Sequence, residues 1–184
     1  MARIAEKTAK AFRLTDDAWL RHANPWSVYT RIPIPPAFAL AVWSRRWIGR
    51  WSLIPAGAVC LWTWINSRAF PPPRSLDNWA SKAVQGERLW SDPGADSVVW
   101  RHRRAVEALT VVNALGLPLI AWGVWALKGW VLLTGLMMQS CGKLWTLDRM
   151  VWLYEDVTHE RADHAARGHN TNNDRAARVE EGPA

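Results

Sequence analysis

The chain of 184 residues has only two cysteines, Cys60 and Cys141, and both lie in apolar stretches. This scarcity excludes a disulfide framework and a cysteine metal cluster. Residues 1–20 carry charges but no apolar core of a secretory signal, so none is expected. The sequence also lacks a phosphate-binding glycine loop, a paired carboxylate dyad and a Ser-His-Asp or Cys-His nucleophile set. It therefore indicates no particular reaction and leaves open whether the protein is an enzyme.

The histidines do not point to a metal or a haem. His159, Glu160 and His164 have the spacing His-Glu-x-x-x-His, which is not the i, i+4 pair of a zinc-protease helix. His22 and His102 are isolated in the sequence. We expect no metal and no cofactor.

What the chain has in unusual amount is tryptophan, with fifteen residues, together with 49% hydrophobic residues and a net charge of +7. Tryptophan favours sites where one side of the indole is apolar and the ring N–H reaches a polar group, as at a bilayer interface. Most of the tryptophans cluster near the ends of apolar runs: Trp43, Trp47, Trp51, Trp62, Trp64, Trp122, Trp125, Trp130, Trp145 and Trp152. The composition therefore favours an integral membrane protein over a soluble one.

The basic residues flank the apolar runs and do not form a stripe with spaced base-stacking aromatics. This arrangement favours attraction to anionic membrane lipids over binding of nucleic acid.

The predicted fold is all-α, with about four transmembrane helices in two hairpins plus amphipathic surface helices. The first apolar run is short, because its 14 helical residues span roughly 21 Å against a hydrocarbon core of about 30 Å. The first two runs therefore either both span or form a re-entrant hairpin, and two spans are favoured. The predicted spans are residues 35–49, 51–66, 106–127 and 130–149.

Three segments lie outside these spans. Residues 1–22 are predicted to be an amphipathic helical segment on the membrane surface or a partly disordered basic terminus, and residues 77–104 an interfacial helical segment. Together with the spans they make one membrane domain, residues 1–157. Residues 158–184 are polar and are predicted to be a largely disordered tail after about two further helical turns.

The charge distribution predicts the orientation. With four spans, 19 of the lysines and arginines fall on the side of both termini and 4 on the other side. The positive-inside rule then places both termini in the cytoplasm of a cell whose plasma membrane the chain crosses several times. The first loop, with Arg45, Arg46 and Arg50, is the weakest part of this prediction.

The fourth predicted span carries a small and polar stripe, because Thr134, Cys141, Asp148 and Glu155 recur every seven residues. Glycines beside the stripe permit close helix approach. The stripe either lines a polar pocket open to the cytoplasm or forms a packing seam, with an ion pair between Asp148 and Arg149 at the surface.

Five segments together resemble a family of small bacterial and archaeal integral membrane proteins known only as a domain of unknown function. The segments are HANPWSVYTR at 22–31, FPPPR at 70–74, DNWAS at 77–81, GERLW at 86–90 and GKLWTLDRMVWLYED at 142–156. The resemblance covers roughly residues 15–157. The resemblance implies a helical membrane protein and indicates no activity, substrate or catalytic residue.

With four spans, all of these segments fall on the cytoplasmic side. We therefore predict that polar side chains from separate segments converge there to bind a lipid headgroup or another anionic amphiphile. The candidate residues are Asn24, Arg31, Arg74, Asn78, Glu87, Lys143, Asp148, Arg149 and Glu155.

Two classes of function are compatible with such a cluster. The favoured one is a non-enzymatic protein that binds membrane lipids, with a homo-oligomer or a partner membrane protein as further possible associations. The alternative is a small membrane enzyme acting on a lipid or isoprenoid, with Asp148 or Glu155 as acid/base and Arg31 or Lys143 holding the anion. The enzyme requires an enclosed cleft and a carboxyl group of raised pKa.

Overall fold

The computed structural model describes residues 16–91 and 97–180, and every regular element among them is a helix. This confirms the all-α prediction. The helices are α2 (Asp16–His22), α3 (Pro25–Arg31), α4 (Ile34–Trp43), α5 (Arg45–Ile48), the 3₁₀ turn η1 (Gly49–Ser52), α6 (Leu53–Ala69), α7 (Trp79–Ser91), α8 (Ser97–Trp125) and α9 (Gly129–Glu180).

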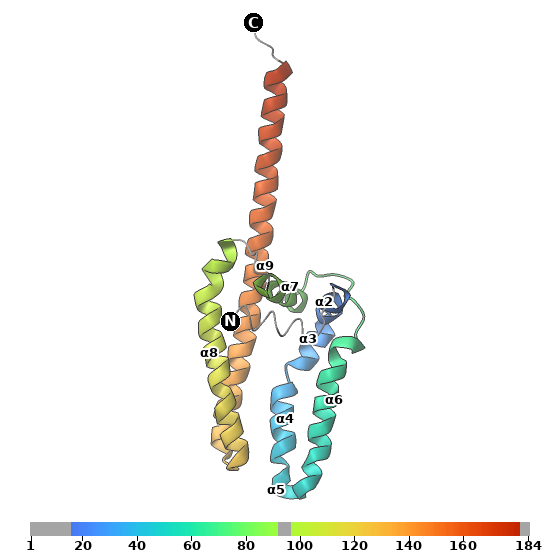
Figure 1. The fold of residues 1–184 in the computed structure, drawn as a ribbon, viewed down its shortest axis with the longest axis vertical. Helices are drawn as coiled ribbons and strands as arrows, with labels where there is room; N and C mark the ends of the chain where they lie inside the picture. The colour runs from blue at the N-terminus through green and yellow to red at the C-terminus, as the bar shows by residue number, and fades with distance from the viewer. Residues whose placement is uncertain (1–15, 92–96, 181–184) are drawn as a thin grey trace.

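The long helices form two antiparallel hairpins, which lie side by side in Figure 1. In the first hairpin, α5 and η1 join α4 to α6, and Gly49 permits the turn with a φ of 57°. In the second, a short turn after Trp125 joins α8 to α9. The tips lie at the same end, because Nη2 of Arg45 donates to the carbonyl oxygens of Val124 (2.7 Å) and Trp125 (2.6 Å). Arg45 thereby supplies a charged partner to the C-terminal carbonyls of α8.

The second hairpin is held together by close backbone contact between α8 and α9. A Cβ atom added to Gly142 would lie 2.8 Å from the backbone nitrogen of Asn113, and one on Gly123 would lie 2.5 Å from that of Leu132. Such distances leave no room for a side chain, so the glycines beside the predicted stripe pack against α8. The stripe residues Thr134 and Cys141 are themselves exposed, so the prediction that the stripe lines a pocket or forms the seam is wrong for these two.

Helix α7 lies across α9 near the middle of the molecule (Figure 1). At their crossing a Cβ atom on Gly86 would overlap the backbone carbonyl of Met150. Around this point Ala83 packs with Leu147 and Val151 in a buried cluster. Because α7 sits directly on the α9 backbone, its flanking polar residues reach side chains of α9.

Helices α2 and α3 continue this layer above the first hairpin. Asn24 caps α3 by accepting from the Trp26 backbone N–H at 2.9 Å, and Pro25 occupies the first turn. The Ser81 hydroxyl donates to the carbonyl of Ala23 at 2.6 Å and so ties α7 to the α2–α3 corner.

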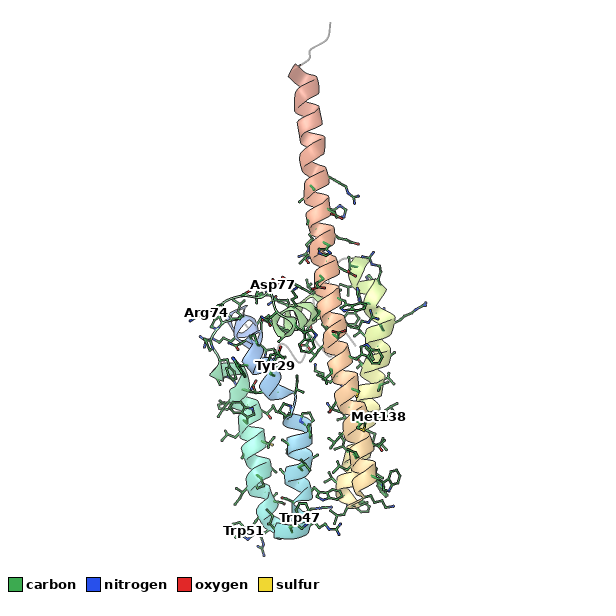
Figure 2. All side chains as sticks on the ribbon, turned by 180° about the vertical axis from the view of Figure 1, so that it is seen from behind. Tyr29, Trp47, Trp51, Arg74, Asp77 and Met138 are labelled. Atoms are coloured by element: carbon green, nitrogen blue, oxygen red, sulfur yellow. The ribbon has the colours of Figure 1, made fainter. Side chains whose placement is uncertain are left out.

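The hairpins present large apolar side chains to the outside, as Figure 2 shows around Trp47 and Trp51. Of the described helices, α8 alone is long and apolar enough over Val98–Trp125 to cross a membrane by length and hydropathy. Only 11% of its most apolar stretch is buried, whereas the core helix of a soluble protein would be mostly buried.

The observed helices differ from the predicted segments in two places. Helix α8 begins at Ser97, within the segment that was assigned to the interface. Helix α9 continues to Glu180, whereas only about two further helical turns were predicted beyond residue 157. Residues 162, 165 and 166 are alanine, the strongest helix former, and they extend a helix that is already nucleated. Of the predicted amphipathic segment 1–22, only residues 16–22 lie among the described residues.

Candidate functional site

A cavity of about 280 Å³ opens between the two hairpins at the level of α7. The end of α2, α3, the start of α4, α7 and the middle of α9 contribute its walls. The lining residues are His22, Val28, Arg31, Ile32, Pro35, Val84, Glu87, Gln139, Ser140, Lys143, Leu144 and Leu147. It thus joins residues more than one hundred positions apart in the sequence.

Arg31 is held at the cavity by acceptors on α2 and α3. Its Nε donates to the carbonyl of Ser27 at 3.0 Å and its Nη2 to the carbonyl of His22 at 3.1 Å, while Nη1 contacts the ring nitrogens of His22. Burial lowers the pKa of Arg31 to about 10, so the guanidinium stays charged at pH 7. Burial and the charge of Arg31 lower the pKa of His22 to about 4, so the imidazole is neutral at pH 7 and accepts from Arg31.

Glu87 and Lys143 form the second polar pair of the cavity. The Lys143 ammonium donates to Oε1 of Glu87 at 2.8 Å, joining α7 to α9. Burial by itself raises the pKa of Glu87, but Lys143, His22 and Arg31 together lower it below its ordinary value. The carboxyl group is therefore ionised at pH 7. A general acid at this position needs the opposite shift.

These four side chains leave the cavity with one positive charge. Lys143 and Glu87 cancel, His22 is neutral, and Arg31 is charged. Within the described residues, no carboxylate lies in ion-pair contact with Arg31. The geometry therefore suits a ligand group with a single negative charge.

The rest of the cavity wall is largely apolar. Val28, Ile32 and Pro35 line it from the first hairpin side, and Leu144 and Leu147 line it from α9. A site with a charged group beside such a wall can accept a molecule that has a polar head and a hydrocarbon part.

The structure brings three of the nine predicted site residues, Arg31, Glu87 and Lys143, to this cavity. Two of the others stabilise helix starts: Asn24 caps α3 and also donates to the Pro71 carbonyl at 2.9 Å, and Asn78 accepts from the Ser81 backbone N–H at 2.9 Å.

The remaining four predicted residues lie elsewhere. Asp148 accepts from Nε1 of Trp79 at 3.1 Å and does not pair with Arg149, whose guanidinium lies 4.5 Å from the ring centre of Trp152. Glu155 accepts from Lys82 at 3.0 Å, and Arg74 is exposed after the proline run. Hydrogen bonds to Asp77 and Glu155 raise the pKa of Lys82 above its ordinary value.

The sequence did not point to His22, which lines the cavity, or to Asn66, which supports α3 from outside the cavity. His22 was dismissed as isolated, although it begins one of the quoted segments and faces Arg31 nine residues later. Asn66 is fully buried and accepts from the Ser27 hydroxyl at 3.0 Å while donating to that of Thr30 at 2.7 Å, which fixes α3 against α6. A polar residue inside a predicted apolar span was the signal available for Asn66.

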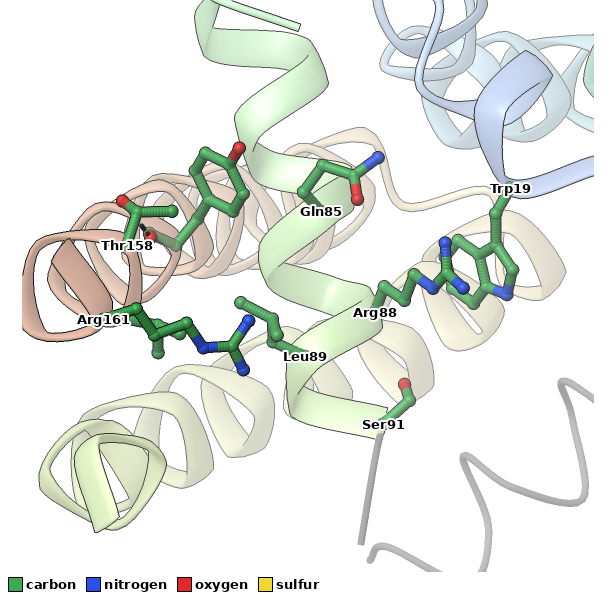
Figure 3. A pocket seen from close by; sticks show the side chains of 9 residues that line it. Trp19, Gln85, Arg88, Leu89, Ser91, Thr158 and Arg161 are labelled. Carbon is green, nitrogen blue, oxygen red and sulfur yellow. Dashed lines mark hydrogen bonds between the residues drawn. The ribbon is translucent and has the colours of Figure 1, made fainter. Parts of the chain in front are cut away.

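A second hollow of about 440 Å³ lies on the side facing away from the hairpin tips, between α2, α7 and α9 (Figure 3). Its lining includes Trp19, Gln85, Arg88, Leu89 and Arg161. It is an open surface depression and offers no enclosed site.

The fold and the cavity define a small all-α protein with an apolar exterior. Among its described helices one is long and apolar enough to cross a membrane, and a largely apolar cavity with charged side chains lies between two helical hairpins. The chain belongs to a family of unknown function, DUF6653, whose model matches residues 3–172. This confirms the resemblance seen in the sequence. No curated protein and no solved structure matches the chain.

Proposed function

We propose that the protein is a multi-pass plasma-membrane protein that binds membrane lipid, without catalysis, in the cavity between its hairpins. Both hairpins cross the bilayer, the tips face outward, and both termini lie in the cytoplasm. The single observation that carries the lipid-binding role is the cavity itself, where Arg31 stands beside a wall of aliphatic side chains.

The apolar exterior supports membrane insertion of both hairpins. Leu53 and Trp130 each expose 73% of their surface, and Leu61, Leu117 and Met137 are also exposed. Soluble monomers rarely leave contiguous apolar surface of this extent open to water, whereas lipid covers it at no cost.

The tryptophans support the placement of the two interfaces. At the tips Trp47 and Trp125 are exposed, and near the other end Trp64 and Trp100 are exposed. Trp100 and Trp125 are separated along α8 by roughly 37 Å at about 1.5 Å per residue, close to the thickness between two headgroup regions.

The link between the tips favours two spans over a re-entrant first hairpin. Arg45 bonds to the carbonyls at the end of α8, so the first hairpin reaches the same depth as the second. Helix α6 has 17 residues, roughly 26 Å, and slight local thinning of the bilayer covers the difference from a core of about 30 Å.

The membrane enzyme remains the second candidate, and its proposed acid/base residues have other partners here. Asp148 accepts from Trp79, and Glu155 pairs with Lys82. Neither lines the cavity that contains Arg31 and Lys143. The arrangement therefore favours binding over catalysis.

Membrane insertion is tested with single spin labels on a background without Cys60 and Cys141. The variants Leu61→Cys on α6 and Leu117→Cys on α8 have nearly equal exposure, 57% and 56%, and Asp163→Cys is the control on the projecting part of α9. In proteoliposomes we expect labels at 61 and 117 to be accessible to oxygen and shielded from a nickel chelate. Equal nickel access at all three positions contradicts insertion.

Lipid binding is tested by native mass spectrometry of the full chain extracted in mild detergent. We expect lipid to remain bound to the folded protein, and the same spectrum reports whether the protein is a homo-oligomer or carries a partner protein. A folded protein that is free of lipid under all extraction conditions contradicts the proposed function.

A further inference from the structure

We infer that the cavity binds the headgroup of a phospholipid with a single negative charge, and that Arg31 is the residue that binds its phosphodiester. This inference rests on the proposed lipid-binding function and adds the chemical class of the lipid and the residue that selects it.

The first argument is the charge of the site. Lys143 and Glu87 neutralise one another at 2.8 Å, which leaves Arg31 as the uncompensated charge of the lining side chains. One charge matches a phosphodiester whose headgroup carries no further charge. A zwitterionic headgroup would bring a second, positive group into a cavity where Glu87, the only carboxylate among the described lining residues, is already paired.

The second argument is the hydrogen-bonding capacity of Arg31. A guanidinium has five N–H donors. The carbonyls of Ser27 and His22 and the ring of His22 occupy Nε and one donor on each terminal nitrogen. Each terminal nitrogen therefore keeps a second N–H, and such a pair suits two oxygens of one anion. The bonds to α2 and α3 also hold the guanidinium in place before a ligand binds.

The third argument is the position of the cavity. Of its charged side chains, Arg31 and Glu87 come from α3 and α7, which form the layer above the hairpins, and Lys143 comes from α9. From Arg31 the apolar residues Ile32 and Pro35 lead into α4 on the hairpin side. In the proposed orientation this is the depth at which bilayer phosphodiesters lie, with the acyl chains on the hairpin side.

The experiment uses the full chain in vesicles of equal parts phosphatidylglycerol and phosphatidylcholine, extracted mildly and examined by native mass spectrometry. We expect the wild type to retain phosphatidylglycerol about tenfold over phosphatidylcholine. Arg31→Gln should bring the ratio close to one, and Arg31→Lys should give an intermediate ratio because it keeps the charge and loses the paired donors. Arg74→Gln, which removes an exposed arginine outside the cavity, is the matched control and should keep the wild-type ratio.

The ion pair between Glu87 and Lys143 provides a second test that does not depend on the folding of an Arg31 variant. Glu87→Gln frees the Lys143 ammonium, adds one positive charge to the cavity and should strengthen the preference for phosphatidylglycerol over phosphatidylcholine.

The outcomes separate this inference from the proposed function. Equal retention of both lipids by the wild type overturns the inference and leaves lipid binding intact, as does an unchanged preference in a folded Arg31→Gln protein. If a soluble glycerol phosphodiester displaces phosphatidylglycerol at equal concentration, the cavity binds the free phosphodiester and not the lipid, which overturns the inference. Retention of neither lipid removes the proposed function as well.

Discussion

Arg31 and His22 show how one pair of side chains gives the cavity its electrostatic character. The neutral imidazole accepts from the guanidinium and adds no charge of its own, so the positive charge of the site stays on Arg31. The backbone carbonyls of Ser27 and His22 stabilise the guanidinium without neutralising it. The guanidinium of Arg31 is therefore held in place by neutral partners and keeps its positive charge for an anion.

His22 should make the stability of the protein pH-dependent below neutrality. Its pKa is about 4 in the folded chain against an ordinary value of 6.5, so the unfolded chain takes up a proton first as the pH falls. The contribution of His22 is complete above pH 6.5 and is lost progressively down to about pH 4. Between pH 7 and 4.5 we expect the wild type to lose on the order of 2 kcal/mol more unfolding free energy than His22→Gln.

Thermal or denaturant unfolding in detergent at both pH values measures this difference. Glutamine keeps an acceptor for Arg31 and cannot titrate, so the variant also serves as a polar control. Parallel pH profiles for the two proteins would show that His22 is equally easy to protonate in the folded and unfolded chains.

Asn66 should be important for stability although it lies outside the cavity. Asn66→Ala leaves the fully buried Ser27 hydroxyl without its acceptor and removes the donor to the Thr30 hydroxyl, and should cost about 2 kcal/mol. Thr63→Ala on the same helix removes an exposed hydroxyl that bonds only to the carbonyl of Val59, so it should change stability by less than about 0.5 kcal/mol. Equal melting temperatures for the two variants would contradict this role.

At the residue scale the sequence identified Arg31, Glu87 and Lys143 but could not separate them from the other six candidates. Asn24 and Asn78 satisfy backbone N–H groups at helix starts, and Asp148 satisfies an indole N–H. These uses depend on local geometry and on contacts between distant segments, and the residue types alone do not reveal them.

At the scale of elements, the crossing of α7 over α9 is what brings Glu87 to Lys143. The crossing depends on Gly86, which lies against the Met150 backbone. In the part of α7 before the crossing, Lys82 forms an ion pair with Glu155, and the Trp79 indole donates a hydrogen bond to Asp148. A change in the height of α7 over α9 would therefore disturb both the cavity and these outer contacts.

Gly86→Ala should destabilise the protein by about 2 kcal/mol or more, because a methyl group there overlaps backbone and no flexible side chain can yield. Gly57→Ala is the matched control: it lies inside α6 with open space around its Cβ position, and should be neutral or stabilising by about 0.5–1 kcal/mol. Unfolding in detergent measures both. A Gly86→Ala protein as stable as Gly57→Ala would mean that α7 does not rest on α9.

The positions of the helices were predicted better than their ends. Apolar runs located α4, α6, α8 and the first part of α9, because burial or lipid exposure of a helix requires such runs. The start of α8 and the long extension of α9 were missed, since polar helical residues carry no apolar pattern. Helix α3 was also missed, although Asn24 followed by Pro25 is a helix-start signal.

At the scale of the whole molecule, two hairpins share one polar layer. Arg45 joins the tips, and α2, α3 and α7 cover the opposite end. The cavity lies where the hairpins meet this layer, and residues 31, 87 and 143 come together only through that assembly. The sequence predicted the layer from its polar segments, but not which of its residues meet.

The measurement that tests the transmembrane arrangement most directly is labelling of single cysteines in intact cells with a membrane-impermeant maleimide. Arg50→Cys at the tip of the first hairpin, Lys128→Cys at the tip of the second and Asp163→Cys on α9 are compared in a protein without Cys60 and Cys141. We expect positions 50 and 128 to react from outside, and position 163 to react only after the membrane is permeabilised. Reaction at 128 but not at 50 in intact cells, with 50 reacting after permeabilisation, would contradict a first hairpin that crosses the membrane.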